Sequence, residues 1–89
     1  MFKPDNIAAW LPGNIRRSTI LTTAHLDLLA SENAVPDIDP AFYDDRLKNI
    51  FQYYAINPEE MENELHLYAK ELLDQGKIKQ AWQVLLSAG

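Results

Sequence analysis

Gly76 separates two amphipathic segments near the C-terminal end of the sequence, and this feature constrains the fold more than any other. The segment before it places apolar side chains at intervals of three and four residues, the spacing of one helical face. Asn57 and Pro58 favour the N-cap and first position of a helix. Glycine readily adopts the left-handed conformation that ends one. The sequence therefore predicts helices over residues 58–75 and 77–87 that pack as an antiparallel hairpin.

A similar helix-start pattern lies upstream, where Ile38-Asp39-Pro40 resembles Ile56-Asn57-Pro58. In both places the isoleucine can pack on the residue five positions later, as in a hydrophobic staple. We therefore expect a helix over residues 40–54. Its apolar face would consist of Leu47, Ile50, Phe51 and Tyr54.

A further helix is expected over residues 15–31, with Asn14 or Ser18 as its N-cap. Leu26 and Leu29 fall on a different side of this helix from its main apolar face. A helix that is apolar over more than half its circumference is either buried between two neighbours or offers a second contact surface. The main face would consist of Ile20, Leu21, Ala24 and Leu28.

Residues 1–13 are expected to form a short N-terminal helical arm, which Pro12 and Gly13 would end with a turn. So short a helix is marginal by itself, and Trp10 therefore needs a surface to cover it. Two interpretations stay open. The arm is either a lid on the chain's own bundle or an element that inserts into a partner.

These segments predict an all-α fold, a small irregular bundle of four helices with an N-terminal arm and a C-terminal antiparallel hairpin. The chain has 89 residues, of which 47% are hydrophobic, so it is long enough for one modest core. We expect a single domain over residues 1–89, with the arm at 1–13 and the bundle at 14–89.

Four small residues mark the C-terminal segment, and two of them, Ala69 and Ala81, would let two helices approach closely. The four are Ala69, Gly76, Ala81 and Ala88, with larger apolar residues at Leu65, Leu72, Ile78 and Leu85. In this pattern residues 62–89 resemble one hairpin of the tetratricopeptide repeat family, although Leu65 stands where the family commonly has tryptophan. The resemblance covers less than a third of the chain and implies a helix–turn–helix unit of a protein-binding module.

Composition argues against several classes of function. A formal net charge of −5 disfavours binding to nucleic acid or to an anionic membrane. The chain has no cysteine for a disulfide or a thiolate metal site, and its three glycines form no phosphate-binding motif. It also shows no apolar run of membrane-spanning length and no signal-peptide core, so a cytoplasmic location is the default expectation.

The two histidines do not suggest a catalytic or metal site. His66 lies four residues after Glu62 and four before Lys70, which predicts a row of charged side chains on an exposed side of the helix. His25 is expected at the boundary of the core, without a functional role. We therefore predict no catalytic residues, no cofactor and no metal.

The surplus of aromatic and apolar side chains points to contact with another protein. We predict a non-enzymatic adaptor, chaperone-like or regulatory subunit that acts by helix-on-helix packing. Its partner would be a second copy in a homodimer or the helix of another protein. The alternatives are a small acidic inhibitor of a basic surface and an accessory subunit of an enzyme. The interface candidates are Trp10, Leu11, Leu26, Leu29, Tyr53 and Leu67.

Overall fold

The computed structural model describes residues 11–32 and 35–87 and confirms the all-α bundle, with no strand in those two ranges. The predicted N-terminal arm, including Trp10, lies almost entirely outside the described residues. The helical elements, in chain order, are α2 (Gly13–Arg16), α3 (Thr23–Ala30), the 3-10 helix η1 (Pro40–Phe42), α4 (Asp45–Tyr53), α5 (Pro58–Asp74) and α6 (Ile78–Leu86).

The α5–α6 hairpin forms where the sequence predicts it. Asn57 caps α5 by accepting a hydrogen bond from the backbone N–H of Glu60 at 3.4 Å. Gly76 follows the end of α5 with a φ of 79°, in the left-handed region. The N–H of Lys77 donates to the carbonyl of Leu72 at 2.9 Å, and that of Gly76 donates to Leu73 at 3.0 Å. This pair of bonds is a Schellman motif, which ends the helix and reverses the chain.

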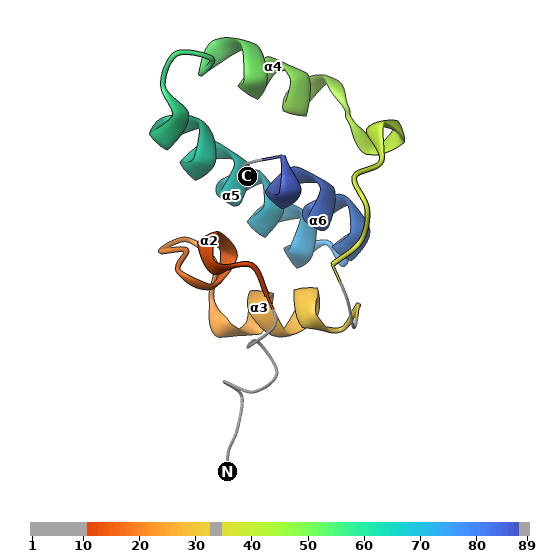
Figure 1. The fold of residues 1–89 in the computed structure, drawn as a ribbon. Helices are drawn as coiled ribbons and strands as arrows, with labels where there is room; N and C mark the ends of the chain where they lie inside the picture. The colour runs from red at the N-terminus through yellow and green to blue at the C-terminus, as the bar shows by residue number, and fades with distance from the viewer. Residues whose placement is uncertain (1–10, 33–34, 88–89) are drawn as a thin grey trace.

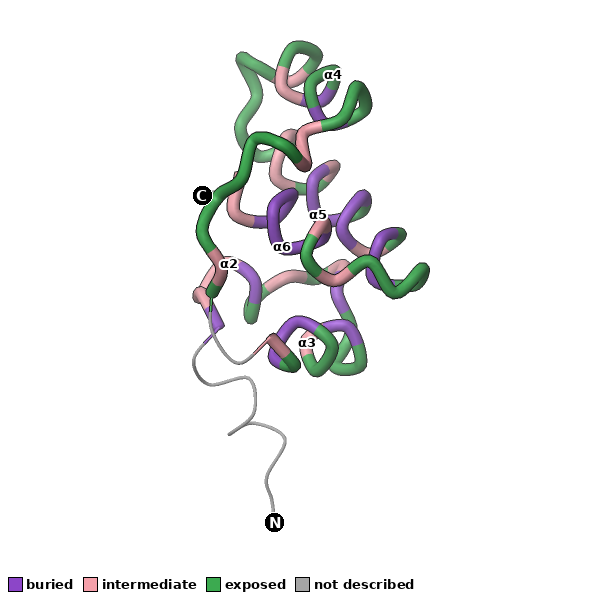
Figure 2. Tube along the Cα trace, turned by 90° about the vertical axis from the view of Figure 1, so that its right-hand side faces the viewer, coloured by how far each residue is buried: buried purple, intermediate pink, exposed green. Residues whose placement is uncertain are grey.

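The hairpin is the middle layer of the molecule (Figure 1). The helix α4 lies along one side of it, and α2 and α3 lie along the opposite side. Figure 2 shows that most of the buried residues belong to α5 and α6. Trp82 of α6 is fully buried, and its indole N–H donates to the carbonyl of Leu29 in α3 at 3.0 Å. The hairpin therefore supplies the core against which the outer helices pack.

The prediction of one helix over residues 15–31 is wrong, because the chain folds there as α2, a loop and α3. Ser18 accepts hydrogen bonds from the N–H groups of Ile20 and Leu21, each at 3.1 Å. Thr22 then caps α3 in a capping box with His25. Serine and threonine hydroxyls offer the backbone an alternative to helical bonding, and here that alternative prevails.

The same error affects the predicted core face of this region. His25 and Leu29 of α3 are buried, whereas Leu28, assigned to the main apolar face, is 36% exposed. Positions 25 and 29 are four residues apart and share one face of α3. The side of the helix that carries Leu29 thus packs on the hairpin. The predicted main face is wrong at Ala24 and Leu28, whereas Leu21 is buried in the core as expected.

The predicted helix over residues 40–54 is also interrupted. The 3-10 helix η1 spans Pro40–Phe42, and α4 begins only at Asp45. Asp39 caps the first segment by accepting from the N–H of Ala41 at 3.0 Å. Asp44 caps the second by accepting from the N–H of Leu47 at 2.8 Å. Two aspartates at cap positions start two helices in succession, so the chain stays extended at Tyr43 between them.

Candidate protein-binding surface

The six predicted interface residues occupy very different positions in the fold. Tyr53 is 80% exposed and Leu67 is 41% exposed, whereas Leu26 is half-buried. Leu11 and Leu29 are buried in the chain's own core, at 2% and 0% exposure, so this arrangement leaves them almost no surface for a partner. Trp10 lies outside the described residues. Tyr53 and Leu67 are therefore the two candidates that the structure places on its surface in exposed positions.

Tyr53 belongs to an aromatic pair at the C-terminal end of α4. Its ring meets that of Tyr54 edge to face, with the ring centroids 4.9 Å apart. Tyr54 is half-buried and packs against the core, whereas most of the Tyr53 side chain is exposed to solvent. The half-buried ring of Tyr54 thus supports the exposed ring of Tyr53 from one side. Exposed tyrosines supported in this way are typical of protein interfaces.

Ile56 adds a second exposed apolar side chain in the turn between α4 and α5. The sequence predicts that it packs on Met61 as a hydrophobic staple, but Ile56 is 97% exposed and this prediction is wrong. The N–H of Asn57 donates to the carbonyl of Tyr54 at 2.9 Å, and this bond holds the turn. Ile56 therefore stands in solvent close to the tyrosine pair.

Carboxylates of α5 lie next to the same turn. Partial burial and the charges of Glu64 and Glu60 raise the pKa of Tyr54 above its usual value. On α5, Glu60, Glu64 and Leu67 are spaced by four and three residues and therefore share one side of the helix. We call these exposed and half-buried residues the α4–α5 corner. It consists of Tyr53, Tyr54, Ile56, Glu60, Glu64 and Leu67.

An open hollow of about 740 Å³ adjoins the corner along α4. Its lining comes from α4 and from Tyr54, the C-cap of that helix, with Arg46 near one end of the helix and the tyrosine pair at the other. The lining residues are Arg46, Asn49, Ile50, Gln52, Tyr53 and Tyr54. The hollow therefore gives a partner side chain access to a surface that mixes aromatic and amide groups.

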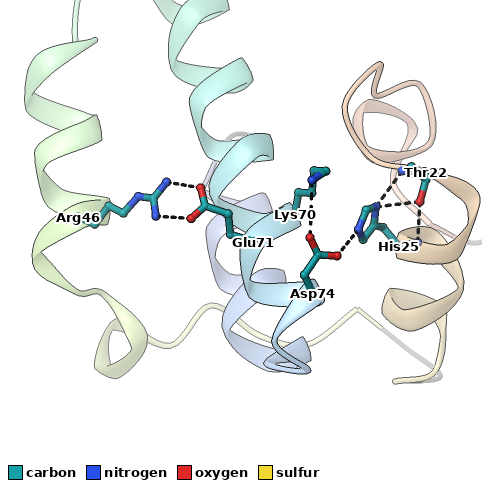
Figure 3. Close-up of polar contacts among 6 residues, drawn as sticks. All are labelled: Thr22, His25, Arg46, Lys70, Glu71 and Asp74. Atoms are coloured by element: carbon teal, nitrogen blue, oxygen red, sulfur yellow. Dashed lines mark hydrogen bonds and ion pairs between the residues drawn. The ribbon is translucent and has the colours of Figure 1, made fainter.

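Side-chain bonds connect α4 and its N-cap to α5. The guanidinium of Arg46 forms a bidentate pair with Glu71, with N···O distances of 2.9 and 2.7 Å (Figure 3). It also lies over the ring of Tyr68, 4.3 Å from the centroid. The Tyr68 hydroxyl donates to Asp44. Burial and this bond raise the pKa of Tyr68 to about 12, so the hydroxyl keeps its proton at neutral pH.

On the opposite side of α5, Asp74 connects the hairpin to α3. Its carboxylate lies 2.9 Å from Nε2 of His25, and the Lys70 ammonium lies 3.6 Å from its other oxygen (Figure 3). Nδ1 of His25 in turn accepts from the backbone N–H of Thr22 at 3.0 Å. The bond to His25 is the first cause of a lowered pKa at Asp74. His25 is therefore a buried residue of the α3 capping box, whereas the sequence predicts only a histidine at the boundary of the core.

His66 is not part of an exposed row of charges, so that prediction is wrong. Its side chain is buried at 4% exposure, and Nδ1 lies 2.8 Å from the Ser18 hydroxyl. Ser18 already accepts from two backbone N–H groups, so its own proton donates to Nδ1 and leaves the His66 proton on Nε2. Nε2 is buried and has no partner among the described residues. A hollow of about 340 Å³ adjoins it, lined by Asn14, Arg17, Ser18, Thr19, Glu62, Asn63 and His66.

Gln83 is an internal polar residue that the sequence reasoning missed. It is 2% exposed, and its amide bonds the backbone on both sides of Ile38: Nε2 donates to the Asp37 carbonyl at 2.8 Å and Oε1 accepts from Asp39 N–H at 2.6 Å. A lone glutamine within an apolar helical run was the available signal. Gln83 fastens the loop that leads into η1 and α4 to the hairpin.

No group of three or more metal-ligating side chains gathers within the described ranges. Among the helices that the structure describes, none combines the length and apolar character needed to cross a membrane. In the comparisons with known proteins, no family model, curated protein or solved structure matches this chain.

Proposed function

We propose that this chain is a non-enzymatic protein–protein interaction module that binds another protein through the α4–α5 corner. The observation that carries the proposal is the exposure of Tyr53 and Ile56, at 80% and 97%, on neighbouring positions of one corner. Leu67 extends the apolar surface along α5. Tyrosine in such a position offers a large contact area at a small cost in conformational entropy.

The packing behind the corner supports this role. A binding surface loses less free energy on association when the bound conformation already exists in the free protein. The Arg46–Glu71 pair and the Tyr68–Asp44 bond join the N-terminal end of α4 to α5. The turn that carries Ile56 joins the other end of α4 to α5, so the exposed side chains lie on two connected helices and the short turn between them.

The test is the mass of the complex that the chain forms in its native cell. Replacing the exposed pair in a Tyr53→Ser/Ile56→Ser variant should release the partner, while Leu28→Ser on α3 removes a partly exposed leucine at the opposite side as the control. Both variants should melt like the wild type, because they alter exposed positions. Loss of the complex in both variants, or in neither, contradicts the proposal.

The acidic-inhibitor hypothesis remains as a second candidate, favoured by the net charge of −5 and by Glu59 and Glu60 in the first turn of α5. It predicts that binding depends chiefly on charge. A complex held by charge should dissociate in about 0.5 M salt, where charges are screened within a few ångströms. A complex held by Tyr53 and Ile56 should persist there, because burial of apolar surface is not screened by salt.

A further inference from the structure

The apolar side chains of the α4–α5 corner stand beside negative charge. Glu60 and Glu64 lie near the Tyr54 hydroxyl, and Glu59 precedes them in the first turn of α5. Among the described residues, Glu60 and Glu64 take part in no ion pair. Their charge is therefore available to a partner that covers the tyrosine pair.

The acidic row faces the side of α5 on which α4 lies. Glu71 continues the row of Glu60, Glu64 and Leu67 at the same helical spacing, and it bonds Arg46 of α4. The row therefore lies on the side of α5 that faces α4. A partner segment seated on Tyr53 would meet Glu60 and Glu64 at its edge.

Two cations of the helices that form this surface, Arg46 and Lys70, are already paired. Arg46 lines the hollow, but Glu71 binds its guanidinium through two oxygens and Tyr68 lies beneath it. Lys70 is directed to Asp74 on the other side of α5. The corner thus combines exposed apolar area with uncompensated negative charge.

A second copy of the chain fits this surface poorly. In a symmetric dimer the same patch faces itself, so the second copy would bring its own Glu60 and Glu64 to the interface and would supply no positive charge from this patch to pair with them. A positively charged partner would meet them favourably. Exposed apolar side chains on α4, on the turn and on α5 offer a surface on which the apolar face of a helix can pack.

Building on the proposed function, we infer that the α4–α5 corner binds a basic amphipathic helix of a partner protein. The apolar face of that helix packs on Tyr53, Ile56 and Leu67. Its lysine or arginine side chains pair with Glu60 and Glu64 at the rim. Rim charges select the partner and speed its association, while the apolar centre supplies most of the affinity.

The probe is a synthetic amphipathic helix of leucine, alanine and lysine, compared with a matched peptide in which every lysine is replaced by glutamate. Binding to the full chain is measured by calorimetry at about 0.15 M salt, and the site is mapped by amide NMR shifts. The lysine peptide should bind and shift residues 53–67, and the glutamate peptide should not. Tyr53→Ser/Ile56→Ser should weaken binding about tenfold or more.

A matched pair of charge variants separates the rim from the overall charge. Glu60→Gln/Glu64→Gln should weaken binding of the lysine peptide about three- to tenfold. Asp27→Asn/Asp37→Asn removes the same charge from exposed positions elsewhere and should change the affinity less than about twofold. Equal losses in the two variants would show general attraction to an acidic protein and overturn the inference.

The remaining outcomes distinguish this inference from the proposed function. Equal binding of both peptides at the corner would show that the inferred preference for a basic helix is wrong, while the proposed function stands. The same conclusion holds if neither peptide binds but binding of the native partner still depends on Tyr53 and Ile56. If the chain forms a dimer that Tyr53→Ser/Ile56→Ser dissociates, the occupant is a second copy and the inference is overturned. Shifts confined to other residues overturn it as well.

Discussion

At the scale of single residues, His66 shows how hydrogen-bond geometry sets a protonation state. Nδ1 of His66 accepts from Ser18 within the interior, so the imidazole is held neutral with its proton on Nε2. Burial lowers the pKa of His66, and Glu62 opposes that shift only in part. An exposed row of charges would have left this imidazole free to titrate in water.

The lowered pKa of His66 predicts a loss of stability in mild acid. Below about pH 6.5 the unfolded chain binds a proton at this position that the folded chain refuses, so the free energy of unfolding falls as the pH falls. The loss amounts to about 1.4 kcal/mol for each unit by which the folded pKa lies below the unfolded one. It ends below the folded pKa, where both states are protonated.

Denaturant unfolding of the wild type and His66→Gln at about pH 7 and about pH 5 measures this effect. The variant should lose less stability between the two pH values, because the two proteins differ only at position 66. The paired carboxylates Asp74 and Glu71 have lowered pKa values and lose their contribution only in stronger acid. Equal losses in the two proteins would show that His66 is not the group responsible.

At the scale of elements, the sequence predicts helices well where the local signals agree. Asn57, Pro58 and Gly76 all place the hairpin boundaries where the structure has them. The two upstream helices are interrupted because Ser18, Thr22 and Asp44 cap new segments inside the predicted ranges. A capping side chain competes with helix continuation, and periodicity alone does not show which one prevails.

Gly76 offers a direct test of the hairpin turn. Its φ of 79° lies in a region that costs an L-residue about 1–2 kcal/mol, and an added Cβ would meet no atom within 4 Å. Gly76→Ala should therefore lower the free energy of unfolding by about 1–2 kcal/mol through backbone strain alone. Gly76→Asn should cost less, because asparagine tolerates this conformation better. Thermal or denaturant melts of both variants measure these losses. If neither substitution lowers the free energy of unfolding, the left-handed turn at Gly76 is contradicted.

At the scale of the whole molecule, the fold class follows from the sequence but the surface does not. The all-α bundle with its C-terminal hairpin is confirmed. Of the interface candidates, Leu11 and Leu29 proved to be core residues. Leu29 is buried because the broken first helix turns a different face to the hairpin. Ile56 and the acidic row belong to the corner for reasons of tertiary geometry. The sequence assigned Ile56 to a staple and the glutamates to a helix N-terminus.

The central claim is that the α4–α5 corner is the protein-binding surface, and site-specific cross-linking in the native cell tests it most directly. A photo-reactive amino acid would replace Tyr53 in one experiment and Asp27, exposed on α3 at the opposite side, in the control. The account predicts a defined cross-linked protein from position 53, joined through a segment rich in lysine or arginine, and none from position 27. Cross-linking from position 27 alone, or equally from both positions, would contradict it.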